Sequence, residues 1–301
     1  METPNFLFAS DGKLRSGWRF TAFTAVFVVT YIFFVSIAFA VFQRLGLDPA
    51  GPNWFLVHSL IALSIALILG WIAGKYFERL PFEALGVSFR NNWLRNSLIG
   101  LAAGVATFAL AAGVAVLFGG MRFSFNADAS PGSIAATLLI SFLVFAAAAA
   151  FEEALFRGYI LQTFIRSDLT FFGVVLTSLL FASIHNSNPS ANLISWVNTF
   201  LAGIWLGIAY LKTRDLWFPT ALHLAWNWAQ GSIFGIEVSG LTDISKNPIL
   251  REMDLGPAWL TGGSYGMEGG VATTIALVVS TVAIWFIPFR KSDDQSLQFK
   301  L

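Results

Sequence analysis

Two glutamates and an arginine stand in an otherwise apolar stretch of this sequence. Glu152, Glu153 and Arg157 follow a run of alanines in FLVFAAAAAFEEALFRGYI. In a membrane-spanning helix each such charge costs about 2.5–3.5 kcal/mol, so each needs a reason. Glu153 and Arg157 share one helix face, with the acid before the base, whereas Glu152 lies about 100° further round. The spacing predicts that Arg157 neutralises Glu153 and leaves Glu152 facing a cavity. A structural ion pair beside a protonated carboxyl explains the same pattern.

Histidine and asparagine side chains extend this set. His185 stands in FASIHNSNP and His223 in FPTALHLAWNW, where Asn227 follows four residues later on the same helix face. Carboxylate and imidazole are the groups that move protons near neutral pH, so the combination favours proton-transfer chemistry. A single histidine in a membrane helix more often joins two helices by a hydrogen bond, but the joint occurrence of these groups favours a functional site. His58 begins a different apolar stretch, and we interpret it as a structural residue at the membrane interface.

The elements that must position these residues are membrane-spanning helices. The 301-residue chain is 56% hydrophobic and 12% charged, with a formal net charge of +1 and no cysteine. Soluble chains contain about 25% charged residues, so the composition excludes a soluble enzyme and a disordered protein. The lack of a basic excess excludes a nucleic-acid binder. The lack of cysteine excludes disulfides, thiolate–metal sites and a cysteine nucleophile. A span needs about 20 apolar residues, and the stretches that provide them are 18–42, 54–74, 97–119, 133–156, 169–187, 192–211, 216–236 and 270–289.

Lysine and arginine residues in the loops orient these stretches. With the N-terminus in the cytoplasm, the inside segments hold 13 of them and the outside segments hold four, namely Arg44, Arg122, Lys246 and Arg251. The sequence therefore predicts an all-α polytopic membrane protein with about eight transmembrane helices and both termini cytoplasmic. We expect a single domain over residues 1–301. We also expect the site to open to the cytoplasm, because Glu152 precedes the cytoplasmic Arg166 closely in the sequence.

At these residues the sequence resembles the CPBP family of intramembrane proteases. That family includes the type II CAAX prenyl endopeptidases and the Abi proteins linked to bacteriocin self-immunity. The family motifs occur here in the family order: Glu152-Glu153-x-x-x-Arg157, Phe181-x-x-x-His185 and His223-x-x-x-Asn227. They fall within residues 145–230, and the rest of the chain resembles the family only in the layout of its spans. The resemblance implies a multi-pass protein of the bacterial inner membrane that cleaves a membrane-associated or prenylated protein or peptide.

The resemblance also implies a role for each motif. Glu152 and His185 would activate a water molecule, and His223 with Asn227 would bind the oxyanion of the tetrahedral intermediate. The chemistry of the groups agrees, because carboxylate and imidazole can deprotonate water and N–H groups can donate to an oxyanion. No cofactor is required in this scheme. The other two residues of the first motif, Glu153 and Arg157, would orient Glu152.

Other chemistries remain open on the sequence. Two histidines and a glutamate on different helices also suit zinc, although the close-spaced HExxH motif is absent. The segment from Gly262 to Gly266 matches GxSxG around Ser264. We attribute this match to chance, because the serine elbow needs a strand–turn–helix context. A non-catalytic membrane protein with a transport, immunity or pseudoprotease role would use the same polar cluster.

The spans by themselves do not determine how the helices approach one another. Gly100-x-x-x-Gly104 allows another helix to come close, although such a pattern is common by chance in this composition. His185 ends its stretch if that stretch begins at 169, whereas Glu152 lies well inside the stretch before it. The two residues then differ in depth by about 10 Å or more, at a rise of about 1.5 Å per residue. Convergence of the site is therefore implied by the family resemblance and not by the spans.

Overall fold

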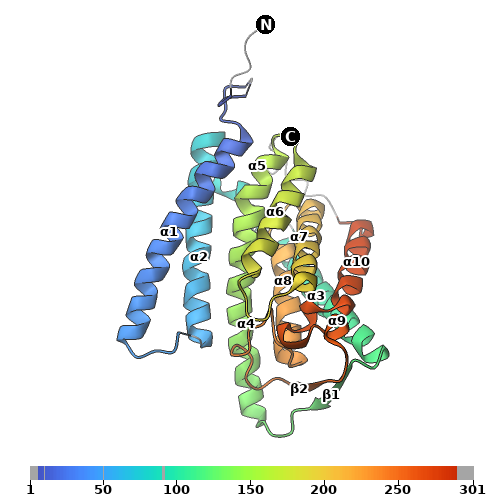
Figure 1. The fold of residues 1–301 in the computed structure, drawn as a ribbon. Helices are drawn as coiled ribbons and strands as arrows, with labels where there is room; N and C mark the ends of the chain where they lie inside the picture. The colour runs from blue at the N-terminus through green and yellow to red at the C-terminus, as the bar shows by residue number, and fades with distance from the viewer. Residues whose placement is uncertain (1–5, 10, 50, 90–91, 290–301) are drawn as a thin grey trace.

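Long apolar helices that run back and forth make up most of the molecule (Figure 1). The computed structural model describes residues 6–9, 11–49, 51–89 and 92–289. The α-helices are α1 (Ser16–Arg44), α2 (Pro52–Ala73), α3 (Trp93–Leu117), α4 (Pro131–Glu153), α5 (Leu161–Ile165), α6 (Thr170–His185), α7 (Leu193–Thr213), α8 (Trp217–Trp228), α9 (Ala258–Thr261) and α10 (Val271–Phe286). The π-helical turns that continue α2, α4 and α8 are η1 (Gly74–Glu78), η3 (Ala154–Ile160) and η4 (Ala229–Ile233). The 3-10 turns are η2 (Phe82–Leu85), η5 (Gly263–Tyr265) and η6 (Met267–Gly269).

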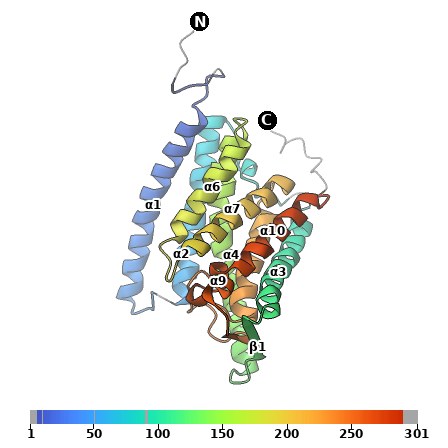
Figure 2. The same cartoon turned by 45° about the vertical axis from the view of Figure 1, so that its right-hand side comes forward.

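The expected spans coincide with these helices. Helix α1 begins and α10 ends at the same end of the bundle, called here the upper end (Figures 1 and 2). Five helical segments in the described part of the chain are long and apolar enough to cross a membrane, as in a multi-pass membrane protein. They are Ser16–Arg44, Pro52–Glu78, Trp93–Leu117, Pro131–Ile165 and Leu193–Thr213. Helices α6 and α10 are shorter and also apolar. The count of eight spans and the side of the termini stay predictions. Some of the cations assigned to the cytoplasmic side lie outside the described residues: Arg90, Arg290, Lys291 and Lys300.

The expectation of an all-α protein needs one correction, a small antiparallel sheet at the lower end of the bundle (Figure 1). Strand β1 (Met121–Phe125) pairs with β2 (Leu250–Asp254), so that Met121 lies opposite Asp254 and Phe125 opposite Leu250. Apolar and polar residues alternate in MRFSF, which is the period of a strand. A run of five residues between two spans is too short for this period to be decisive. The sheet joins the α3–α4 connection to the long connection 237–269.

Glu252 of β2 lies outside the spanning segments and has an unusual environment. Burial, together with the negative charges of Glu237 and Asp254, raises the pKa of its carboxyl from 4.5 to about 7. Its Oε2 has no hydrogen-bond partner among the described residues. The folded protein therefore holds this carboxyl protonated over a pH range in which the unfolded chain ionises it.

Close packing of α3 on α8 sets the position of the helix that carries His223. A Cβ added to Gly100 would lie 2.6 Å from the carbonyl oxygen of Phe218. A Cβ added to Gly104 would collide with the carbonyl oxygen of Leu222. Backbones approach this closely only where the side chain is absent or very small. The GxxxG pattern of α3 is thus the surface against which α8 packs.

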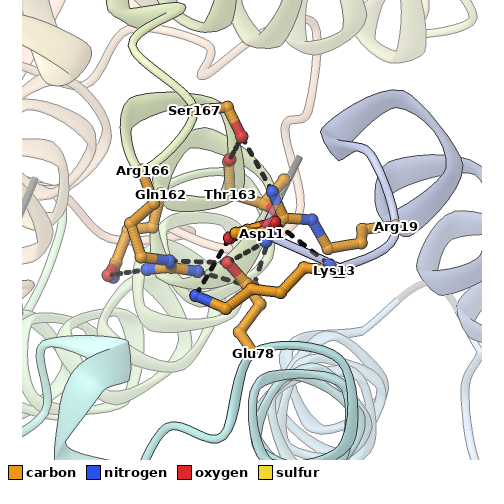
Figure 3. Close-up of polar contacts among 8 residues, drawn as sticks. All are labelled: Asp11, Lys13, Arg19, Glu78, Gln162, Thr163, Arg166 and Ser167. Atoms are coloured by element: carbon orange, nitrogen blue, oxygen red, sulfur yellow. Dashed lines mark hydrogen bonds and ion pairs between the residues drawn. The ribbon is translucent and has the colours of Figure 1, made fainter. Parts of the chain in front are cut away.

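A cluster of charged and polar side chains ties the upper ends of α1, α2 and α5 together (Figure 3). Arg166 donates from Nε to Glu78 Oε1 at 2.8 Å and from Nη2 to Glu78 Oε2 at 2.9 Å. Arg19 donates from Nη1 to the same carboxylate and from Nη2 to Ser167 Oγ, the latter at 2.7 Å. Arg19 is one of the 13 cations that the sequence assigns to the inside segments, but in the structure it is buried within α1. Glu78 offsets the cost of burying it, because a carboxylate and a guanidinium compensate each other's lost hydration.

Candidate active site

The first motif closes α4 and runs into the π-helical turn η3. Arg157 Nη1 donates to Glu153 Oε1 at 2.9 Å, and both side chains are fully buried. Arg157 Nη2 donates to the carbonyl oxygen of Gly203 in α7, also at 2.9 Å. Glu152, in contrast, keeps 18% of its side chain exposed. The geometry follows the i,i+4 spacing: Arg157 is paired with Glu153 inside the protein, and Glu152 faces open space. Such π-helical turns within helices are frequent at functional sites.

His223 of α8 lies between the two glutamates. Its Nδ1 is 3.1 Å from Glu153 Oε1, and its Nε2 is 3.8 Å from Glu152 Oε2. An ionised carboxylate only accepts hydrogen bonds, so the proton of the shorter contact sits on Nδ1. The neutral ring then presents Nε2 as an acceptor, and Nε2 donates only when the ring is doubly protonated. Glu153 therefore orients both Arg157 and His223.

His185, the last residue of α6, is oriented by its own helix. Its Nδ1 lies 2.8 Å from the carbonyl oxygen of Phe181. A carbonyl oxygen only accepts, so Nδ1 carries the proton and Nε2 of the neutral ring is left as a base. The Phe181 ring lies 4.6 Å from the ring of His185 and 6.0 Å from that of His223, centroid to centroid. It also lies 5.2 Å from the guanidinium carbon of Arg157. The FxxxH motif thus fixes the tautomer of His185 and places an aromatic ring among the charged groups.

The expected difference in depth between Glu152 and His185 is wrong. The helical segment that carries Glu152 does not end at 156 but runs from Pro131 to Ile165, so Glu152 lies 13 residues before its end. His185 lies 15 residues after the start of α6 at Thr170. At about 1.5 Å per residue, both are about 20 Å from the turn that joins the two segments. The two segments run antiparallel from the same turn. Residues at equal distances from that turn therefore lie at the same depth in the bundle.

A cavity of about 620 Å³ collects the groups expected to act on a substrate. Glu152, His185, His223 and Asn227 all line it, whereas Glu153 and Arg157 do not. Side chains of α1, α2, α4, α6, α7 and α10 complete a wall that is mostly apolar. The volume falls within the range of ligand pockets, about 300–1,000 Å³. The arrangement can therefore hold an apolar segment against a carboxylate, two imidazoles and an amide.

The cavity reaches the connections at the lower end of the bundle. With both termini in the cytoplasm, as predicted, an opening at this end would face away from the cytoplasm, so the two expectations from the sequence do not fit together. Its wall includes Asn188 in the α6–α7 connection, and Ser239 and Glu268 in the connection 237–269. These connections lie away from the α5–α6 turn, which is at the upper end (Figure 1). Glu152 and Arg166 are close in sequence, but about 20 Å of helix separates them. Nearness along a helix does not imply a shared membrane face.

Two groups in the cavity wall were not expected from the sequence. Glu268 Oε2 accepts hydrogen bonds from the backbone N–H and the hydroxyl of Ser239, at 2.6 and 2.7 Å. Trp226 Nε1 donates to Glu268 Oε1 at 3.3 Å, so these bonds fasten the connection 237–269 to α8. The second group is His58 with Tyr31, whose ring nitrogen Nε2 and hydroxyl are 2.5 Å apart. The only hint in the sequence that His58 belongs to the site was the rarity of histidine in this chain. The packing of α1 and α2 is what places His58 in the cavity.

The alternatives based on zinc and serine fit the structure less well. Among the described residues, no group of three or more His, Cys, Asp or Glu side chains is arranged to hold a metal ion. Ser264 is exposed in the 3-10 turn η5, follows a helical turn and not a strand, and does not line the cavity.

Comparison with known proteins adds to this geometry. Residues 133–229 match the family described as Rce1-like type II CAAX prenyl endopeptidases, and all three motifs fall within the match. The chain is also similar to an uncharacterized 24.3 kDa protein of Escherichia coli. The two are 27% identical over 189 residues, which covers 62% of this chain and 83% of that protein. Helices α1, α2 and α3 precede the family match, and α9 and α10 follow it.

Proposed function

We propose that this protein is an intramembrane endopeptidase, because residues 133–229 match the Rce1-like type II CAAX prenyl endopeptidase family. It hydrolyses a peptide bond of a membrane-associated protein or peptide, prenylated substrates included. The observation that carries the proposal is the convergence of Glu152, His185, His223 and Asn227 on one cavity.

Glu152 supplies the base in this proposal. Its Oε2 is buried and has no hydrogen-bond partner among the described residues. The rest of the Glu152 side chain lines the cavity and is 18% exposed, so a water molecule in the cavity can approach the carboxyl group from that side. A water held there gives a proton to Glu152 while its oxygen attacks the carbonyl carbon, and His185 Nε2 assists as a second acceptor. The proton then passes to the leaving amine, so hydrolysis proceeds without a covalent intermediate.

His223 and Asn227 bind the oxyanion, one turn apart on α8. Asn227 donates from its side-chain amide. His223 donates from Nε2 only as imidazolium, and the carboxylates that compensate this charge are those of Glu153 and Glu152, at 3.1 and 3.8 Å. Glu153 is thus a positioning residue for the ring, and Arg157 holds Glu153 in place.

The proposal includes the topology. Eight helical segments cross the inner membrane of a bacterium, with both termini in the cytoplasm and one domain over residues 1–301. The distribution of Lys and Arg supports this orientation, and so does the common end at which α1 begins and α10 ends (Figure 2). The lower end, which carries the connection 237–269, then faces away from the cytoplasm.

Cleavage of a peptide library by the purified protein in lipid nanodiscs tests the catalytic proposal. The wild type should cleave apolar peptides at internal bonds, as product masses will show. Glu152→Gln keeps the shape and loses the base, so it should abolish cleavage while the protein still folds. Ser264→Ala is the matched control and should cleave like the wild type, because Ser264 does not line the cavity.

Two outcomes would establish other functions. A chelator should have no specific effect; one zinc per active chain, lost together with activity in His223→Ala, would establish a metalloprotease. Binding of peptides by the folded wild type without any cleavage would support the non-catalytic membrane role.

A further inference from the structure

Tyr31 of α1 and His58 of α2 form a polar pair in the cavity wall, outside the segment matched by the family. The Tyr31 hydroxyl lies 2.5 Å from His58 Nε2, and both side chains line the cavity that holds Glu152. The ring of Tyr31 stacks on Phe27 and Phe151, at centroid distances of 5.8 and 6.5 Å. These contacts fix the polar pair within a part of the wall that is otherwise aromatic and aliphatic.

The pair has one hydrogen-bond donor to spare. A neutral histidine carries one N–H and a tyrosine carries one O–H, and the bond between them uses one of the two. If the hydroxyl donates to Nε2, then His58 Nδ1–H remains. If Nε2–H donates to the hydroxyl, then the Tyr31 O–H remains. In either tautomer one donor is left beside an apolar cavity, where an occupant that accepts it gains free energy.

The charges around the cavity select the kind of acceptor. Within the described part of the chain, its wall contains the carboxylates of Glu152 and Glu268 and no lysine or arginine. Glu152 lines the same cavity as His58. An anionic group such as a free C-terminal carboxylate would meet this negative charge without a permanent cation to compensate it. A neutral amide carbonyl meets no such repulsion, and the apolar wall suits the side chains beside it.

We infer that the Tyr31–His58 pair is a substrate subsite that donates a hydrogen bond to a backbone carbonyl of an uncharged, apolar peptide segment. The inference rests on the proposed function and deepens it, because it gives the peptide a second attachment point away from Glu152. The pair acts on the bound peptide before and during the chemical step alike. Its loss therefore weakens binding and leaves the chemical step unchanged.

Histidine ring signals test the subsite directly, because the chain contains only three histidines. The sample is the Glu152→Gln protein, labelled with ¹⁵N-histidine and studied by NMR in nanodiscs. The His58 signals are assigned as those that disappear when His58→Gln is added to this protein. Titration with an acetylated and amidated leucine–alanine peptide should change the His58 ring signals saturably. The same peptide with a free C-terminal carboxylate should bind more weakly.

Three results would overturn the subsite. The peptide could change the signals of His185 or His223 and leave His58 unchanged, or the free acid could bind more tightly than the amide. Either result leaves the proposed function intact. A titration that changes no histidine signal also overturns the subsite, and cleavage of the peptide library by the wild type then decides the proposed function by itself.

A matched pair of variants separates binding from packing. Tyr31→Phe keeps the ring stacked on Phe151 and removes the hydroxyl, so the dissociation constant of the amidated peptide should rise about three- to tenfold. With a cleaved peptide, KM should rise by the same factor at unchanged kcat. Tyr76→Phe is the control, because Tyr76 is 73% exposed and lies in η1. An unchanged dissociation constant together with a lower unfolding temperature would show that Tyr31 only packs α1 on α2.

Discussion

Replacing Glu153 with glutamine should destabilise the protein far more than the same change at Glu152. Arg157 is fully buried, and its guanidinium has two protein acceptors, Glu153 Oε1 and the carbonyl oxygen of Gly203, each at 2.9 Å. Glutamine leaves the shape of the contact and removes its charge. The buried guanidinium then remains without a carboxylate in contact with it.

The size of the effect follows from this geometry. Two unit charges about 4 Å apart attract each other by about 4 kcal/mol at an effective dielectric constant of about 20. Removing one partner of a buried ion pair costs about 3–5 kcal/mol, which agrees with that figure. A loss of about 4 kcal/mol lowers the ratio of folded to unfolded protein about a thousandfold. Glu152→Gln should change stability by less than about 1 kcal/mol, because the Glu152 side chain reaches open space and its contact with His223 is long, 3.8 Å.

Unfolding in mixed micelles with increasing SDS, followed by tryptophan fluorescence, measures both variants. The double variant Glu153→Gln/Arg157→Gln removes both charges and should recover most of the lost stability, because two neutral side chains carry no desolvated charge. It should recover no proteolysis, since His223 has lost its ionised partner. Equal stability of Glu153→Gln and Glu152→Gln, or a double variant no more stable than Glu153→Gln, would refute the assignment of Glu153 as the counter-ion of Arg157.

Other predictions concern the oxyanion donors, the open side of the cavity and the effect of pH. Asn227→Ala should lower kcat by about 10²–10³ with little change in KM, since the donor acts on the developing charge; steady-state kinetics that show a raised KM at unchanged kcat would assign Asn227 to substrate binding. In the cysteine-free chain, Asn188→Cys should react with a membrane-impermeant maleimide on intact cells, and Leu169→Cys in the α5–α6 turn only after permeabilisation; the reverse pattern would invert the proposed topology. Glu252 should make the protein less stable as the pH rises, because its folded-state pKa of about 7 exceeds the usual 4.5. This contribution to stability is complete at a pH below the pKa of the carboxyl in the unfolded chain, and it is lost as the pH rises through about 7. Unfolding temperatures between about pH 5 and pH 8 should fall more for the wild type than for Glu252→Gln, and parallel curves would contradict this account.

The sequence by itself determined the features that depend on neighbours along the chain. The apolar stretches locate the helices, because burial in a membrane requires about 20 consecutive apolar residues. The pairing of Glu153 with Arg157 follows from their spacing on one helix, and the structure has that pair at 2.9 Å. The exposure of Glu152 to a cavity follows from the same spacing, since it lies on a different face of the helix.

Only the tertiary structure decided which helices meet and at what level. The level of His185 depends on how far the preceding helix continues, and hydropathy underestimates that length because Glu152, Glu153 and Arg157 interrupt the apolar pattern. The contacts of Arg19 with Glu78 and of Tyr31 with His58 join different helices, 59 and 27 residues apart in sequence. Hydropathy and helical period describe one helix at a time, and they carry no information about which face of another helix lies opposite. The packing of the bundle therefore decides which polar residues share the cavity and toward which end of the bundle it lies.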